Sequence, residues 1–310
     1  MKSSEKNKEN ILTASLFVII PTFMLIVGYY FFAYPISDNV LSYLQIPMFL
    51  GLFLLIIGYF IKQIPTGNYI KISGWLIFAF YWSTQPMTLY IGEGNDFFNG
   101  AVCVIGVYVL CYIAYHEWLS VKRGENISCL NWIAGASGLA GIIYFGIEKT
   151  FIADWLIDRV TEQSAYVTDF FVNSIYIEPG TSNIFIDGEY AVSIIFACTA
   201  VQSIVIFVGM IGVLPKIDMK RRAIGLAITI IPVYILNLFR NAMVGILVGK
   251  EITSFSMAHN IIAKSGSLIA LIILLVIVIK IIPEVFDEIF CFVDLHKRNG
   301  PIEKIFRRKK

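Results

Sequence analysis

The chain has 310 residues, of which 57% are hydrophobic and 15% charged, with a formal net charge of +2 and a mean hydropathy of +0.75. The apolar residues form runs of about 20 residues, which is long enough to cross ~30 Å of hydrocarbon. This composition excludes a soluble enzyme, and the long runs exclude a β-barrel, whose strands would be short and alternating.

The apolar runs predict an all-α polytopic membrane protein, a single integral membrane domain over residues 1–310 with about eight transmembrane helices. The first run, Ile11–Tyr34, is too long for the core of a signal peptide and lacks a small-residue cleavage site, so we expect it to be retained. In chain order, the spans are expected at 11–34, 40–61, 70–91, 97–119, 130–152, 191–214, 222–248 and 260–282.

The distribution of positive charge predicts the orientation of these spans. Eight spans place both termini on one side of the membrane, and all but five of the 24 Lys and Arg residues fall on that side, Lys71 of the second loop among them. The five others are Lys149, Arg159, Arg240, Lys250 and Lys264. Positively charged loops face the cytoplasm, so we expect both termini inside.

The fifth loop is the longest one on the extracytoplasmic side. Its first part, from Ala153, repeats apolar residues at helical spacing with acidic residues between them, which predicts a helix at the membrane interface. Glu178-Pro-Gly180 then separates two β-branched stretches, which favours a β-hairpin.

We therefore divide the membrane domain into four regions. They are an N-terminal five-helix region (1–152), an extracytoplasmic cap loop (153–190), a catalytic three-helix region (191–282) and a basic cytoplasmic tail (283–310).

Strongly polar side chains occur within the last three predicted spans. Such groups are costly in a bilayer unless they are paired or hydrated, so each one is a functional candidate. They are Cys198 and Gln202 on one face of the sixth span, Asn237, Arg240 and Asn241 on one face of the seventh, and His259 and Lys264 in the eighth. With the predicted orientation, three helices bring Cys198, Arg240 and His259 to one depth near the outer face.

Cysteine, arginine and histidine together are suited to nucleophilic acyl transfer. A thiolate attacks a carbonyl, an imidazole moves protons, and a guanidinium stabilises the oxyanion. Gln202, Asn237, Asn241 and Lys264 are then candidates for binding the substrate. Taken singly, each residue has a simpler explanation, such as packing for Cys198, snorkelling for Arg240 and interhelical bonding for the amides.

The other cysteines carry no comparable pattern. The chain has no Cys-x-x-Cys motif, and Cys129 and Cys291 are expected on the cytoplasmic side, so neither a disulfide nor a metal site is predicted. No cofactor is expected.

Three stretches resemble the archaeosortase/exosortase family of membrane cysteine transpeptidases. They are "ACTAVQS" around Cys198, "LNLFRNA" around Arg240, and "AHN…KSGSL" after His259, and the resemblance is clearest over about 185–275. The first stretch is more similar to the archaeal branch, with Ala200 where the family is expected to have glycine.

The resemblance implies a fold, a site and a set of partners. Cys198 would be the nucleophile, Arg240 the essential arginine, and His259 the third catalytic position. The substrates would be secreted surface proteins with a C-terminal motif, a transmembrane helix and a basic cluster, and the new C-terminus would pass to a membrane phospholipid. The enzyme would be a multi-pass protein of the cell membrane with its site at the extracytoplasmic face, and would open laterally near the last three spans to admit the substrate helix.

Two alternatives remain open. A transporter of a small anionic or polar solute would use Arg240 and Lys264 as its anion site, although no inverted repeat supports this. A non-catalytic membrane scaffold would tolerate replacement of Cys198 by alanine.

Overall fold

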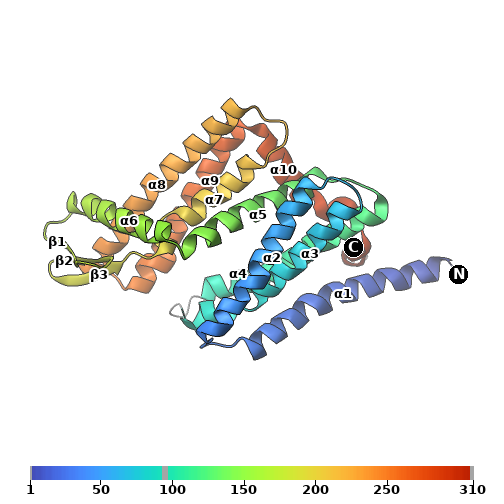
Figure 1. The fold of residues 1–310 in the computed structure, drawn as a ribbon, viewed down its shortest axis with the longest axis horizontal. Coiled ribbons are helices and arrows are strands. Elements are labelled where there is room, and N and C mark those ends of the chain that lie inside the picture. Colours follow the sequence, from blue (N-terminus) through green and yellow to red (C-terminus); the bar gives the residue numbers. More distant parts are fainter. Residues whose placement is uncertain (1, 93–96, 308–310) are drawn as a thin grey trace. The chain divides into compact units, whose positions relative to one another are not determined.

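The computed structural model describes residues 2–92 and 97–307, which are mostly helical (Figure 1). Within these residues, six helices are long and apolar enough to cross a membrane. They are Ile11–Phe31, Asp38–Phe60, Phe97–Arg123, Ser128–Glu148, Met219–Gly249 and Met257–Ile281. The chain is thus a multi-pass helical membrane protein, as predicted, while the count of eight spans and the cytoplasmic placement of both termini stay predictions.

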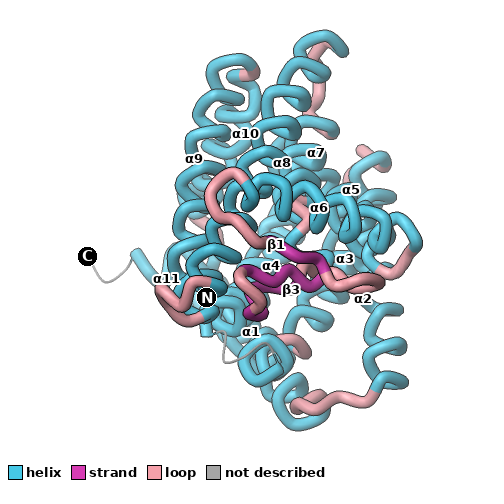
Figure 2. Tube along the Cα trace, turned by 90° about the vertical axis from the view of Figure 1, so that its left-hand side faces the viewer, coloured by secondary structure: helices cyan, strands magenta, loops and turns pink. Residues whose placement is uncertain are grey.

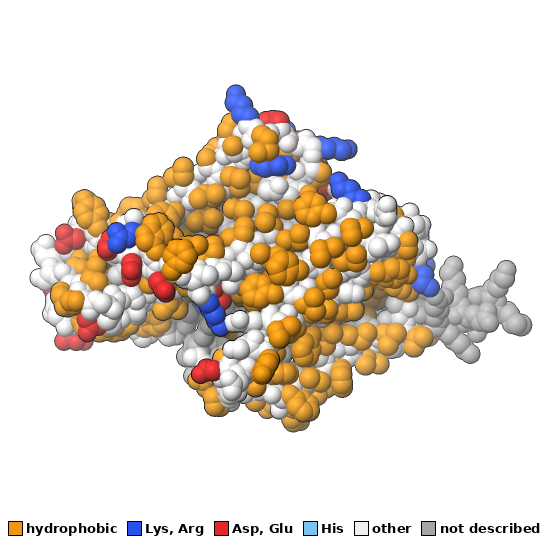
Figure 3. All heavy atoms as spheres, in the orientation of Figure 1, with side chains coloured by type: hydrophobic (Ala, Val, Ile, Leu, Met, Phe, Trp, Pro, Cys, Tyr) orange, Lys and Arg blue, Asp and Glu red, His pale blue; other side chains and the backbone are white. Residues whose placement is uncertain are grey.

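Hydrophobic side chains spread over the helical surfaces, as expected for helices that face lipid (Figure 3). In the same view, acidic side chains gather over α6 (Phe151–Asp169) and the strands that follow it, within residues 175–193. This difference agrees with a membrane-embedded helical part and a more polar segment over residues 151–193.

The chain forms two compact units, Met1–Gly138 with Asp287–Lys310, and Leu139–Phe286. The first unit contains α1 (Lys2–Phe31), α2 (Asp38–Phe60), α3 (Thr66–Ser83), α4 (Phe97–Arg123) and the start of α5 (Ser128–Glu148). Within it, α2 and α3 approach closely at Gly51 and Gly74, where an added Cβ would lie 3.0–3.1 Å from backbone atoms of the other helix. Small residues allow such close helix packing in membranes.

The third predicted span, 70–91, differs from the structure in its bounds and in where it places Lys71. Helix α3 begins earlier and ends at Ser83, and a π-helical turn follows at Thr88–Gly92. Lys71 was predicted to lie in the second loop, and this prediction is wrong. Lys71 is buried in α3 and forms an ion pair of 2.8 Å with Glu117 of α4, which Asn68 also contacts at 2.6 Å.

The C-terminal segment also belongs to the first unit, apart from the start of α10 (Pro283–Val293). It continues through a 3-10 turn (Asp294–Arg298) into α11 (Pro301–Arg307). Cys291 of α10 forms a disulfide with Cys129 of α5, so the expectation of no disulfide is wrong for this pair. The two cysteines are 162 residues apart, and only the tertiary fold brings them together.

The second unit holds the end of α5 and the remaining elements. In chain order these are α6 (Phe151–Asp169), β1 (Ile175–Ile177), β2 (Asn183–Ile186), β3 (Glu189–Ser193), a 3-10 turn (Phe196–Cys198), α7 (Val201–Gly212), α8 (Met219–Gly249), a π-helical turn (Met257–Ala263) and α9 (Lys264–Ile281). Helix α8 begins after Asp218, whose carboxylate accepts a 2.9 Å hydrogen bond from the Arg221 amide.

The three strands form an antiparallel sheet in the order β1-β2-β3 (Figure 2). The predicted helix and hairpin are confirmed as α6 and as β1 with β2. The third strand was missed, although Asp187-Gly188 is a strong hairpin signal. Both residues have positive φ, 53° and 88°, which suits a two-residue turn between twisted strands.

Strand β3 shows that the boundaries predicted for the sixth span, 191–214, are wrong. Residues 189–193 belong to the sheet, and α7 has only 12 residues. The cap, defined here as α6 and the three strands (residues 151–193), therefore leads into a short helix instead of a full span.

The sheet of the cap packs on the C-terminal end of α8. At Gly249 an added Cβ would lie 3.0 Å from the Cβ atoms of both Ala191 and Ile186, so only glycine allows this approach without displacement. Lys250 at the end of α8 forms an ion pair with Asp187 of the β2–β3 turn. These contacts hold the sheet of the cap on α8.

Candidate active site

Cys198 lies in the 3-10 turn between the cap and α7, outside any long helix. Helix α7 starts only at Val201, because Ala200 has a left-handed conformation (φ 67°, ψ −8°) that an α-helix cannot contain. The prediction that Cys198 and Gln202 share one face of a continuous helix is therefore wrong. Gln202 lies in the first turn of α7 and is exposed.

The Cys198 side chain is buried under the cap, with 7% of the residue exposed. It belongs to an apolar cluster whose buried members come from α6, the sheet and the segment after it. These are Val160, Ala165, Ile184, Val192 and Ile194. The cap thus covers the thiol directly.

Two amide side chains of α8 bind the backbone carbonyl of Cys198. Asn237 Nδ2 donates a hydrogen bond of 2.7 Å to this oxygen, and Asn241 Nδ2 donates a second of 3.1 Å. Asn241 Nδ2 also lies 3.4 Å from the hydroxyl of Ser164 in α6. All three side chains are buried, and the two amides confirm that Asn237 and Asn241 share a face of α8.

Arg240 lies on the same stretch of α8, between Asn237 and Asn241 in the sequence. Its Nε atom is buried and has no hydrogen-bond partner among the residues that the structure describes. A buried guanidinium nitrogen without a partner is costly, and a ligand oxygen would satisfy it.

A pocket of about 240 Å³ lies between α7, α8 and α9, beside the Cys198 turn. Its polar lining comes from Ser203, Asn237, Arg240 and Ser267, and the rest is apolar or small. The pocket has room for a few side chains, whereas a whole helix is ~10–12 Å across. A lateral opening that admits a substrate helix stays a prediction.

The remaining predicted site residues lie in the same unit but do not line this pocket. His259 is half-buried in the π-helical turn, and its ring stacks on Phe255 at 5.0 Å. That turn packs on α8 through Ala258 and Val244. Lys264 begins α9, and neither Lys264 nor Gln202 is among the residues that line the pocket.

Within the described ranges 2–92 and 97–307, no group of three or more His, Cys, Asp or Glu residues could hold a metal ion.

Comparison with known proteins decides the family. The family model for the transmembrane exosortases matches residues 73–279, which is most of the chain. The chain belongs to the transmembrane exosortase family. A curated relative, archaeosortase A of Haloferax volcanii, is 24% identical over 261 residues, which cover 72% of this chain and 83% of the relative. No solved structure matches. Membership indicates a membrane transpeptidase that acts on the sorting signals of surface proteins.

In this exosortase, sequence reasoning missed how the Cys198 turn is held. The spacing of Asn237 and Asn241, one helical turn apart in "LNLFRNA", signalled that both face the same way. It did not reveal that their partner is a backbone carbonyl 39 and 43 residues earlier. Ser164 gave no signal, since one serine in an amphipathic helix is unremarkable.

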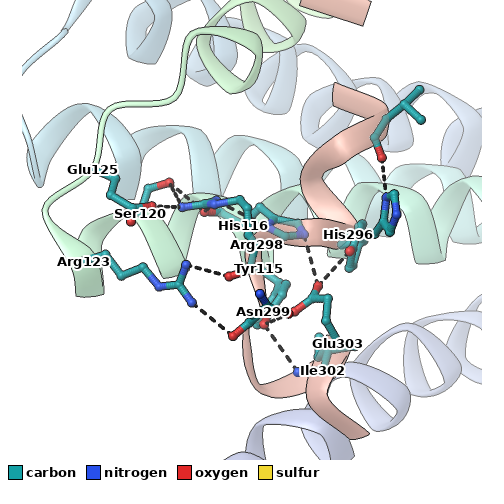
Figure 4. Close-up of polar contacts among 12 residues, drawn as sticks. Tyr115, His116, Ser120, Arg123, Glu125, His296, Arg298, Asn299, Ile302 and Glu303 are labelled. Atoms are coloured by element: carbon teal, nitrogen blue, oxygen red, sulfur yellow. Dashed lines mark hydrogen bonds and ion pairs between the residues drawn. The ribbon is translucent and has the colours of Figure 1, made fainter. Parts of the chain in front are cut away.

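A second polar cluster, in the other unit, was also missed (Figure 4). Glu303 of α11 accepts hydrogen bonds from Tyr112 (2.7 Å) and Tyr115 (3.1 Å) of α4, and its carboxylate lies 3.4 Å from His116. Arg298 donates to the carbonyl of His116 at 3.0 Å. The basic tail predicted from the sequence is therefore docked on α4 through residues 298–303.

Burial of Glu303 by itself raises the pKa of its carboxyl, but the nearby His116 ring and the hydrogen bond from Tyr112 outweigh it and hold this pKa at about 2. The carboxylate is therefore ionised at neutral pH. The cluster joins the C-terminal segment to α4. It belongs to the first unit, whereas the Cys198 turn belongs to the second.

Proposed function

We propose that this exosortase is a cysteine transpeptidase that cleaves the C-terminal sorting signal of secreted surface proteins and transfers the new C-terminus to a membrane phospholipid. The observation that supports this most directly is that one stretch of α8 binds the carbonyl of the buried Cys198 and also carries Arg240, which lines the pocket and whose buried Nε has no partner among the described residues. Family membership supplies the class of reaction.

Cys198 is the proposed nucleophile. Its thiolate sulfur adds to the scissile carbonyl carbon, and the tetrahedral intermediate collapses as the C–N bond breaks. The departing amine takes up one proton and leaves with the helix of the sorting signal. A nucleophilic group of the lipid then attacks the thioester carbonyl, the C–S bond breaks, and the thiolate is restored.

Arg240 is the proposed electrostatic partner of both charged species in this cycle. Its positive charge attracts the negative charge of the attacking sulfur. The free Nε–H is available to the carbonyl oxygen of the substrate, and this hydrogen bond strengthens as negative charge develops on that oxygen. A pocket with apolar walls increases the effect, because little water screens the charge.

His259 is proposed to deliver the proton to the leaving amine, since an imidazole titrates near neutral pH. Its half-buried position on a turn that packs on α8 supports a place near the site. Gln202 and Lys264 stay candidates for contacts with the substrate outside the pocket.

The proposed substrates carry their own transmembrane helix, followed by a basic cluster. The apolar pocket would receive side chains of that helix while the preceding motif meets Arg240 and Cys198. We place this site at the extracytoplasmic face of the cell membrane of an archaeal host. The transporter alternative gains no support, because Lys264 does not share the pocket with Arg240.

The test is expression of Cys198→Ala and Cys198→Ser in the native host beside wild type. Both variants should leave surface-protein precursors with their C-terminal helix intact, as seen by electrophoretic mobility and C-terminal peptides. Cys103→Ala is the matched control, since Cys103 is also a buried cysteine outside any disulfide but lies in the other unit. Normal processing by a stably inserted Cys198→Ala protein would remove the proposal.

A further inference from the structure

We propose that Asn237 and Asn241 are positioning residues that fix the nucleophile by jointly binding the backbone carbonyl of Cys198. The proposal rests on the assignment of Cys198 as the nucleophile, and it replaces the expectation that these two amides bind the substrate.

The turn that carries Cys198 lacks the support that a helix would give. It consists of a 3-10 turn followed by Ala200 in a left-handed conformation, and regular hydrogen bonding of α7 begins only after these residues. Thr199 adds a local bond from its hydroxyl to the Phe196 carbonyl at 2.6 Å. Backbone hydrogen bonds from Cys198 to Ile195 (2.8 Å) and from Thr199 to Phe196 (3.0 Å) close the turn, so the carbonyl of Cys198 is the group that is held from outside it.

Helix α8 supplies these contacts from a rigid position. Asn237 and Asn241 are one helical turn apart, 8% and 4% exposed, and both donate to the same oxygen. A carbonyl oxygen has two lone pairs, so the two amides satisfy it fully. Arg240 lies between them in sequence. One stretch of α8 therefore binds the turn of the nucleophile and also contains its proposed electrostatic partner.

The hydrogen bonds leave little of Asn241 for a substrate. Its amide nitrogen has two protons, and the carbonyl of Cys198 and the hydroxyl of Ser164 account for both. Ser164 belongs to the cap and is fully buried. One amide thus joins α8, the Cys198 turn and the cap helix.

Two donors on one acceptor predict a specific form of non-additivity. Removing one amide leaves the buried carbonyl with a partner, whereas removing both leaves it unsatisfied, which is the more costly change. We expect Asn237→Leu and Asn241→Leu each to lower kcat by less than about fivefold, and the double variant to lower it by at least about 50-fold, with KM near the wild-type value.

The experiment measures two quantities on the full-length protein in membranes. The first is kcat and KM for processing of a surface-protein precursor. The second is the rate of Cys198 alkylation by N-ethylmaleimide, read from the Cys198 peptide by mass spectrometry. Freeing the turn should expose the buried thiol, so the double variant should alkylate Cys198 at least about tenfold faster while its kcat falls. Cys103 and Cys111 are buried cysteines that form no disulfide, and their unchanged alkylation shows that the fold is retained.

Asn131→Leu is the matched control. Asn131 also donates its amide to a backbone carbonyl, that of Tyr59 at 3.4 Å, but in the other unit. It should leave kcat, KM and Cys198 alkylation at wild-type values. If the double variant does not accumulate, the two single variants decide the matter, with a lower kcat, an unchanged KM and faster Cys198 alkylation expected in each.

Two outcomes would overturn the proposal. One is a double variant with wild-type kcat and wild-type Cys198 alkylation. The other is a rise in KM in each single variant with no change in Cys198 alkylation, which would make the amides substrate contacts. Because alkylation does not depend on catalysis, it still tests the clamp if Cys198→Ala shows that the nucleophile has been misassigned.

Discussion

The side-chain amide of Asn237 donates a 2.7 Å hydrogen bond to the backbone carbonyl of Cys198, although 39 residues separate them. This contact joins α8 to a turn that lies outside the α-helices. It also places the stretch of α8 that carries Arg240 against the thiol, so the geometry of the site depends on packing between α7, α8 and the cap.

Ala200→Gly should stabilise the protein. Ala200 has φ 67°, a conformation that costs a residue with a Cβ about 1 kcal/mol relative to glycine. The melting temperature in detergent should rise by a few degrees, with processing at or near the wild-type rate. Ala200→Val should do the opposite, since a β-branched residue fits this conformation worst. A lower melting temperature for Ala200→Gly would contradict the left-handed turn.

Arg240→Lys should abolish most activity while sparing the fold. Lysine keeps the positive charge but has no Nε–H and no planar fork, so it cannot replace the proposed hydrogen bond to the substrate carbonyl. We expect processing to fall by about 10²-fold or more. The melting temperature should change little, because Nε has no partner to lose among the described residues. Processing at the wild-type rate would show that charge alone is sufficient.

The buried pair of Lys71 and Glu117 should respond differently to single and double replacement. Glu117→Leu leaves the Lys71 ammonium buried without its partner, which should cost about 3–5 kcal/mol in the free energy of unfolding. Lys71→Met combined with Glu117→Leu should recover most of this loss, because neither charge is then left unpaired. Thermal unfolding of the three proteins measures the difference. A double variant as unstable as the single one would contradict the pairing.

Docking of the C-terminal segment should depend on pH through Glu303. Its carboxyl has a pKa of about 2 in the folded protein, below the ordinary value of 4.5. The carboxylate therefore stabilises docking above about pH 4.5, and this contribution is lost as the pH falls towards about 2. Hydrogen exchange of residues 298–304, corrected for intrinsic rates, should show protection declining over this window. Glu303→Gln should be less protected at neutral pH and should lack the decline.

The sequence by itself determined the class of protein, the place of most long helices, and the residue types at the candidate site. Runs of about 20 apolar residues have few alternatives to a membrane helix. The order of Cys198, Arg240 and His259 and the motifs around them were sufficient to indicate the family that the comparisons then confirmed. The hairpin turn at Glu178–Gly180 could also be predicted, since turn residues act locally.

Only the tertiary structure decided how these residues meet. Apolar periodicity does not distinguish a helix from a short strand and a turn within one apolar run, so residues 191–200 were assigned to a span. The partners of Asn237, Lys71, Glu303 and Cys129 lie 39, 46, 187 and 162 residues away in the chain. Such pairings depend on packing between elements, which residue spacing along the chain does not encode.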